Sequence, residues 1–229
     1  MAYVQSVSND AGGSGTGTTQ AFGANNNAGN TLIFAVRCGV DNTVTVSDSK
    51  GNTWTENVHQ VQSSDLGLLS VWSAPNCAAG ANTVTFGFST AVTARWVIAE
   101  YDGMVTSNVF DVKTATDSAG STSTTPTSGS ATPTTNNSLV LGVVATGGSQ
   151  GTITAGSGYT LREAANATFR VALEDKIITG TAAQTASFNF TGADITVTAV
   201  VIYKMQGTAP SRGEPLTSQT FMSMNRGFR

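Results

Sequence analysis

The chain alternates short apolar runs with polar turns, and no segment keeps a helical spacing of apolar residues over three turns. Residues 31–36 and 139–144 are nearly continuous apolar runs, which is typical of strands buried on both faces. In residues 83–88, Thr and Gly alternate with Val84, Phe86 and Phe88, as in a strand with one exposed face. Turn residues separate these segments. The pattern predicts an all-β protein.

The sequence also repeats itself. Residues 82–101 align without a gap to residues 184–203, and the segment that starts at Asn30 resembles the one that starts at Asn137. Self-similarity of this kind indicates two related halves, about 1–105 and 106–207. Because nothing like a linker lies near residue 105, we expect residues 1–207 to form one jelly-roll-like β-sandwich built from the two sequence-related halves. Two tandem sandwiches are the alternative.

Two segments rich in Gly, Ser and Thr, residues 9–29 and 114–136, occupy matching places in the two halves. Threonine favours strands. We therefore expect each segment to form loops around one exposed edge strand.

Composition narrows the class of protein. Only 11% of the residues are charged and the net charge is −3, whereas 39% are hydrophobic, which excludes a disordered chain. A pI near 5.0 argues against a nucleic-acid partner. No apolar run approaches the roughly 20 residues that span a bilayer, so no membrane partner is expected. Cys38 and Cys77 form at most one bridge, and two free buried thiols are favoured.

The first residues lack the basic and apolar segments of a secretory signal. A surface-type β protein without its own export signal is what a virus particle protein, delivered by lysis, would look like. The expected location is the virion, and the alternative is the bacterial cell surface or a secreted form.

Residues 208–229 differ in character from the repeat. They hold three of the seven arginines and have a net charge of +2, and Pro210 and Pro215 prevent them from joining a central strand. Arg, Met and aromatic residues are enriched in protein interfaces. We therefore expect an extended C-terminal tail that docks on a neighbouring subunit, with a tail folded back on its own sandwich as the alternative. The candidate docking residues are Arg212, Phe221, Met222, Met224, Arg226, Phe228 and Arg229.

Groups suited to catalysis are scarce. His59 is the only histidine and lies in an alternating segment, so we expect a surface residue. Glycosidases use pairs of carboxylates, but we interpret the pairs Glu100 with Asp102 and Glu174 with Asp175 as solvated carboxylates. The segment 48–52 loosely resembles a calcium loop without its last ligand, and a hairpin turn explains it more simply. No enzyme, cofactor or metal site is expected.

Three tryptophans, Trp54, Trp72 and Trp96, are candidates for stacking on a sugar ring. Trp54 aligns with Tyr159 in the repeat, and a shared role in core packing explains that match equally well. Core packing is the favoured interpretation.

Five motifs occur in a fixed order, namely DSKGNTW (48–54), VIAEYDGM with VFDV (97–112), NNSLVLGVV (136–144), AGSGYTLRE (155–163) and ALEDKI (172–177). Together they resemble a family of uncharacterised β-sandwich proteins found on bacterial surfaces and among phage structural genes, over about residues 1–204. The resemblance implies a structural or adhesive role and supplies no catalytic residue.

The sequence thus predicts a non-enzymatic bacteriophage virion structural protein, either a capsid decoration or a tail-associated protein. Its expected partners are other virion proteins and further copies of itself, as a homo-oligomer for which a trimer is the first guess. The alternative is a carbohydrate-binding or adhesion module that recognises a cell-surface glycan. A hydrolase is a third hypothesis, and it requires Glu100 and Asp102 to face each other across a cleft.

Overall fold

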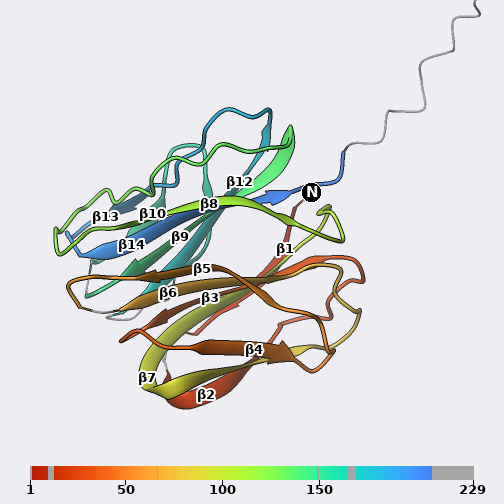
Figure 1. Cartoon of the computed structure of the whole chain (residues 1–229), viewed down its shortest axis with the longest axis horizontal. Coiled ribbons are helices and arrows are strands. Elements are labelled where there is room, and N and C mark those ends of the chain that lie inside the picture. The colour runs from red at the N-terminus through yellow and green to blue at the C-terminus, as the bar shows by residue number, and fades with distance from the viewer. Residues whose placement is uncertain (1, 10–12, 66, 149, 165–168, 208–229) are drawn as a thin grey trace, which may run out of the picture.

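The computed structural model describes residues 2–9, 13–65, 67–148, 150–164 and 169–207, which form fourteen β-strands (Figure 1). The described residues contain no helix that is long and apolar enough to cross a membrane. The strands are β1 (Tyr3–Ser8), β2 (Gly13–Ala21), β3 (Thr31–Cys38), β4 (Val44–Asp48), β5 (Thr55–Val61), β6 (Leu68–Ala74), β7 (Thr83–Tyr101), β8 (Phe110–Asp117), β9 (Asn137–Thr146), β10 (Ile153–Ala155), β11 (Thr160–Ala164), β12 (Val171–Thr179), β13 (Phe188–Phe190) and β14 (Thr196–Lys204).

Each half of the sequence builds one antiparallel sheet. The first sheet has the order β1-β7-β3-β6-β5 and the second has the order β11-β12-β9-β14-β8. When the order of the second sheet is reversed to β8-β14-β9-β12-β11, each strand corresponds to the strand at the same position in the first sheet. The chain therefore completes one sheet before it begins the other.

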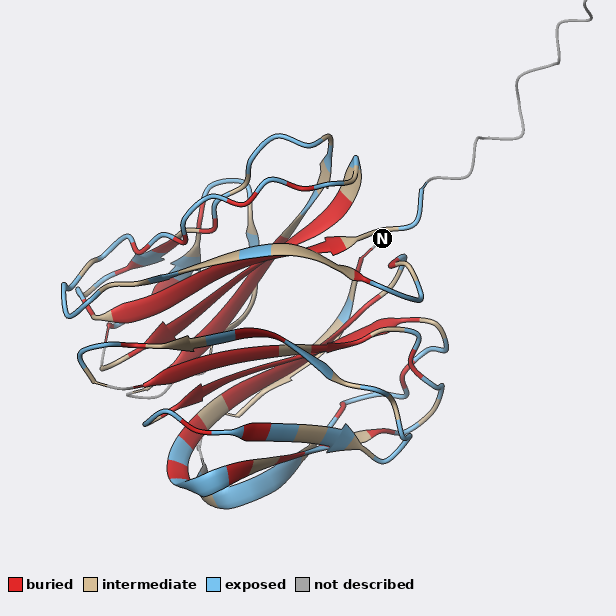
Figure 2. Ribbon diagram, viewed as in Figure 1, coloured by how far each residue is buried: buried red, intermediate tan, exposed pale blue. Residues whose placement is uncertain are grey.

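The two sheets pack face to face as a sandwich around one shared apolar core (Figures 1 and 2). The core cluster takes alternate residues from β3, β6 and β7 in one sheet and from β9, β12 and β14 in the other. Tyr101 and Tyr203, at matching ends of β7 and β14, are both fully buried in it. The predicted all-β sandwich of two sequence-related halves is confirmed.

Strand register shows how the halves correspond in detail. Tyr101 pairs with Thr31, and Tyr203 pairs with Leu139, so Thr31 corresponds to Leu139. Sequence similarity instead matches Thr31 to Ser138, one residue away. Since neighbouring residues in a strand face opposite sides, only the structural register puts corresponding side chains on the same face. The alignment through this strand is therefore wrong by one residue.

The outer face of the first sheet is covered by a further layer from the same half. The 19-residue strand β7 continues beyond the sheet, and its first part pairs with β2 and β4 (Figure 1). This layer and the sheet enclose a second apolar cluster that includes Phe34, Phe86 and Trp96. The rings of Phe86 and Trp96 meet edge to face with centroids 4.8 Å apart.

The outer face of the second sheet has a less regular cover, formed by β10, β13 and residues 118–136. The sequence predicts an edge strand within residues 114–136. In the structure, residues 114–117 end β8, and residues 118–136 form only isolated bridges to residues 184–194. Pro126 and Pro133 lack the backbone N–H that a continuous ladder needs, which accounts for the difference.

The described chain is held in place up to its last residues. Met205 pairs with Met104, the Gln206 N–H donates to the Gly103 carbonyl (2.8 Å), and Asn137 donates to the Gln206 carbonyl (2.6 Å). Residues 208–229, which contain all seven candidate docking residues, lie outside the described residues.

Candidate functional site

The side chain of Glu100 is fully buried, whereas the sequence predicts a solvated carboxylate at this position. Its carboxylate accepts hydrogen bonds from the amides of Gln5 (2.6 Å), Asn26 (2.8 Å) and Asn30 (2.6 Å) and from the Asn27 N–H (2.8 Å). The carboxylate joins β1, β7 and the loop after β2. The expectation of a solvated carboxylate is wrong for this residue, since a polar loop covers the strand end.

The hydrolase hypothesis needs Glu100 to face Asp102 across a cleft. Every described donor around Glu100 is a neutral N–H group from the protein itself, and the carboxylate has no exposed surface. Asp102 is half-buried just beyond the end of β7, where its N–H donates to the Ala2 carbonyl (2.7 Å). The pair does not form the arrangement that this hypothesis requires.

Glu174 and Asp175 are adjacent in β12 and therefore point to opposite faces of the sheet. Both side chains are buried, which differs from the solvated pair that the sequence predicts. Asp175 accepts two hydrogen bonds from the guanidinium of Arg162, at 2.8 and 2.9 Å. That guanidinium also lies 4.3 Å from the ring centroid of Tyr3. Asp175 thus helps to join the edge strands of the two sheets.

Glu174 lies on the outer face, beneath the cover of the second sheet. Its Oε2 accepts a hydrogen bond from the Gly156 N–H (2.8 Å), whereas its buried Oε1 has no hydrogen-bond partner among the described residues. The side chain fills the space beside Gly142, where a Cβ atom would come within 2.6 Å of the Glu174 Cγ. Burial raises the pKa of Glu174 to about 7, although the Gly156 and Ser187 N–H groups and the Lys176 ammonium act in the opposite direction.

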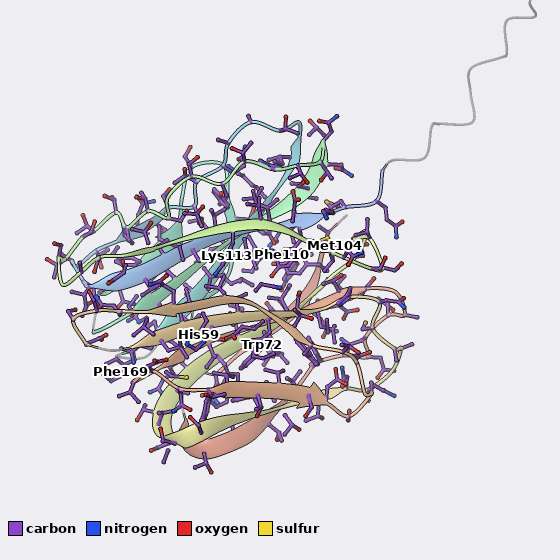
Figure 3. The ribbon with its side chains drawn as sticks, viewed as in Figure 1. His59, Trp72, Met104, Phe110, Lys113 and Phe169 are labelled. Carbon is purple, nitrogen blue, oxygen red and sulfur yellow. The ribbon has the colours of Figure 1, made fainter. Side chains whose placement is uncertain are left out.

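His59 lies on β5 between two carboxylates, and its side chain is 39% exposed (Figure 3). Its Nδ1 is 3.0 Å from Glu56 Oε1 and its Nε2 is 3.1 Å from Asp41 Oδ1. Glu56 also accepts a hydrogen bond from the Ser70 hydroxyl (2.6 Å), which in turn accepts one from the Trp72 indole (2.7 Å). Because Glu56 stands between the histidine and the serine, His59 does not contact Ser70 as the base of a catalytic triad must.

The motif at residues 48–54 is a turn that Asp48 holds together, but it is not the hairpin that the sequence predicts, because β4 pairs with β7 and β5 pairs with β6. The carboxylate of Asp48 accepts hydrogen bonds from the backbone N–H groups of Lys50 (3.0 Å) and Asn52 (3.1 Å), from the Asn52 amide (2.8 Å) and from the Trp54 indole (3.0 Å). Gly51 supplies the left-handed backbone, with φ of 71°. Since N–H donors surround the carboxylate, a cation has no vacant ligand there.

The three tryptophans differ in burial. Trp96 is 2% exposed and belongs to the apolar cluster between the first sheet and its cover, so it is a core residue. Trp54 and Trp72 are half-buried and pack against the same cluster from its edge. Trp72 pairs with Glu56 across β5 and β6, whereas the Trp54 indole donates to Asp48.

Cys38 and Cys77 are free, buried thiols, as the sequence favours. Burial raises the pKa of Cys38 to about 12 and that of Cys77 to about 11. Thiols with such high pKa values hold little of the reactive thiolate at neutral pH.

Two grooves run along the sides of the sandwich, where edge strands of the two sheets meet. The groove between β5 and β8, which we call the Phe110 groove, has a volume of about 250 Å³. Its lining residues are Thr55, Asn57, Ser73, Pro75, Asn108, Val109 and Phe110. The groove between β1 and β11, which we call the Arg162 groove, has a volume of about 290 Å³. Its lining residues are Ala2, Tyr3, Gly158, Thr160, Arg162, Asp175, Lys176 and Ile177.

Comparison with known proteins finds no match for the chain among family models, curated proteins or solved structures. Among the described residues, no group of three or more His, Cys, Asp or Glu side chains is arranged to hold a metal ion. The two grooves, with volumes of about 250 and 290 Å³, offer concave surfaces on which a binding hypothesis can be built from this chain's own geometry.

The grooves cannot be located from the sequence alone, although the repeat matches residues that lie beside them. Tyr101 matches Tyr203, and Thr55 matches Thr160, and these pairs occupy corresponding places beside the two grooves. The repeat does not show how the two sheets are stacked. The stacking decides which edge strands lie next to each other.

The buried carboxyl of Glu174 generates a pH prediction. Its pKa is raised by folding, so the folded state binds an extra proton and its stability falls as the pH rises from about 4.5 to about 7. Glu174→Gln should remove about 2 to 3 kcal/mol of this pH-dependent loss in the free energy of unfolding. The measurement is urea denaturation at pH 4.5 and pH 8.

Glu163→Gln, on the neighbouring strand β11, is the matched control for replacing a glutamate by glutamine. An unchanged pH dependence in the Glu174 variant would show that its carboxyl is not the titrating group.

Proposed function

We propose that this chain is a non-enzymatic structural protein of a bacteriophage particle, a capsid decoration or a tail-associated protein that contacts neighbouring subunits through residues 208–229. The observation that carries the proposal is the contrast between the body and the tail. In the body, residues 1–207, each sheet packs against the other sheet on one face and against a cover layer on the other face. The tail holds three of the chain's seven arginines together with Phe221, Met222, Met224 and Phe228, and these residue types are enriched in interfaces.

The surface of the body supports this division of roles. Among the described residues, the large hydrophobic side chains that are exposed are Val4, Val40 and Ile177. Outer strand positions carry Thr and Ser instead, as in β2 and β4. A surface with few apolar anchors offers little for a stable interface by itself, so the tail is the better source of contact energy.

Charge favours association between the body and the tail. Residues 208–229 contain three of the chain's 11 cationic residues and one of its 14 acidic residues, which leaves a net charge of −5 on residues 1–207 and +2 on the tail. Opposite charges steer encounter between partners and raise the association rate. The proposed partners are other virion proteins and further copies of this chain, with a trimer as the expected homo-oligomer.

Deletion of residues 208–229 tests the proposal. The shortened chain, ending at Gly207, should keep the melting temperature of the full chain, because the described contacts end at Gln206. We expect its amount in purified phage particles, measured by quantitative mass spectrometry, to fall at least tenfold. Equal incorporation of the two chains would contradict the docking role, and absence of the full chain from particles would contradict the virion proposal.

Glycan binding is a second candidate function, favoured by the half-exposed pair Trp54 and Trp72. The Trp72 indole donates to the Ser70 hydroxyl, which donates to the Glu56 carboxylate, and the Trp54 indole donates to the Asp48 carboxylate. Aromatic faces next to acceptors suit a sugar ring, which has apolar faces and donating hydroxyls.

A glycan array with the full chain tests this second candidate. Trp72→Ala should weaken binding to any recognised glycan at least tenfold, whereas Tyr159→Ala, at the position in the other half that corresponds to Trp54, should not. If the array shows no bound glycan, or if Trp54→Ala and Trp72→Ala both bind as the wild type does, the candidate fails.

A further inference from the structure

The Phe110 groove and the Arg162 groove are the same site in the two halves of the repeat. Thr55 pairs with Ser73 as Thr160 pairs with Asp175, and the neighbouring register shifts place Asn57 and Arg162 at corresponding positions. Figure 3 shows Phe110 near the end of the second sheet.

The aromatic residues of the two grooves are also matched. Phe110 pairs with Tyr203 as Tyr3 pairs with Tyr101. The rings meet edge to face in both, with centroids 6.4 Å apart in the first pair and 5.9 Å apart in the second. The duplication therefore provides two versions of one groove that can be compared directly.

The two versions differ in charge. The Arg162 groove is lined by Arg162, Asp175 and Lys176, and its ion pair is bidentate. The lining of the Phe110 groove contains no charged side chain. Lys113, farther along β8, is not one of its lining residues (Figure 3).

The Phe110 groove has an apolar floor and a polar rim. Part of the rim already forms a hydrogen bond within the protein. Val109 is 3% exposed, whereas Phe110 and Pro75 are half-buried and present apolar surface. The side-chain amide oxygen of Asn57 accepts a hydrogen bond from the buried Tyr203 hydroxyl (3.0 Å). A volume of about 250 Å³ is below the roughly 300–1,000 Å³ of small-molecule pockets, which favours individual side chains as occupants.

We propose that the Phe110 groove of one copy binds the uncharged segment at residues 221–224 of a neighbouring copy's tail. This proposal rests on the proposed function and specifies its contact. The segment reads Phe-Met-Ser-Met and holds the aromatic and thioether side chains of the uncharged run 215–225. Flexible Met side chains adapt to irregular apolar surfaces, and the sulfur atoms also contact aromatic rings favourably.

The length of the tail allows residues 221–224 to reach a neighbouring copy. The last described strand ends at Lys204, whose N–H donates to the Val109 carbonyl (2.8 Å), so the tail departs close to its own groove. Thirteen residues lie between Gly207 and Phe221, and the fourteen steps along the chain reach about 46 Å when extended. A compact body of this size has a diameter of about 43 Å. The tail is therefore long enough to cross to an adjacent copy.

A pair of matched substitutions tests the groove. Thr55 and Thr160 are exposed at corresponding places on the two grooves. In the full chain, Thr55→Trp should fill the Phe110 groove and weaken self-association at least tenfold in analytical ultracentrifugation, as should Phe221→Ser. Thr160→Trp should leave self-association unchanged, and all three variants should melt as the wild type does.

Crosslinking tests the native groove without filling it. Phe221 is replaced by a photoreactive phenylalanine analogue in a mixture of isotope-labelled and unlabelled full chains. We expect crosslinks from position 221 to residues 108–110 or 73–75, half of them between labelled and unlabelled chains. Crosslinks confined to one chain would overturn docking on a neighbour.

The outcomes separate this proposal from the function on which it rests. If deletion of the tail abolishes self-association but Thr55→Trp does not, and the crosslinks map elsewhere, the tail docks at another surface and the groove proposal is overturned while the proposed function stands. If deletion of the tail changes neither self-association nor incorporation into particles, both proposals are overturned.

Discussion

The central strands of both sheets are buried on both faces, and the rest of the structure depends on this constraint. Every residue of β3 is buried, as are nine of the ten in β9. Full burial of one large apolar side chain contributes about 1.5–3 kcal/mol, so each sheet needs apolar partners on two sides. The cover layer of the same half supplies one partner, and the sheet of the other half supplies the second. Neither half is therefore complete alone.

At two corresponding positions, one half has a buried carboxylate where the other half has an apolar side chain. Glu100 corresponds to Ile202, and Glu174 corresponds to Trp72, as the strand register shows. Each half thus has one buried carboxylate where the other has an apolar side chain. Glu100 is enclosed by four N–H donors, whereas Glu174 has one unpartnered oxygen. The same divergence produced a charged groove on one side of the sandwich and an uncharged groove on the other.

The fold class, the repeat and most strands could be predicted because apolar periodicity reports burial directly. The face that each residue takes was less predictable, as the one-residue error at Thr31 shows, because similar apolar residues at adjacent positions hide the register. The burial of Glu100 depends on a loop from far along the sequence, which periodicity does not report. The irregular cover at residues 118–136 follows from two prolines whose effect depends on the partner strand. The grooves could not be predicted because they arise from sheet stacking.

Differential scanning calorimetry of the full chain tests the central claim, that the two halves form one interdependent unit. The account predicts a single unfolding transition whose calorimetric enthalpy equals its van't Hoff enthalpy, because loss of either sheet exposes the inner face of the other. Two separate transitions, each with the enthalpy expected of about half the body, would show that the halves fold independently and would contradict the account.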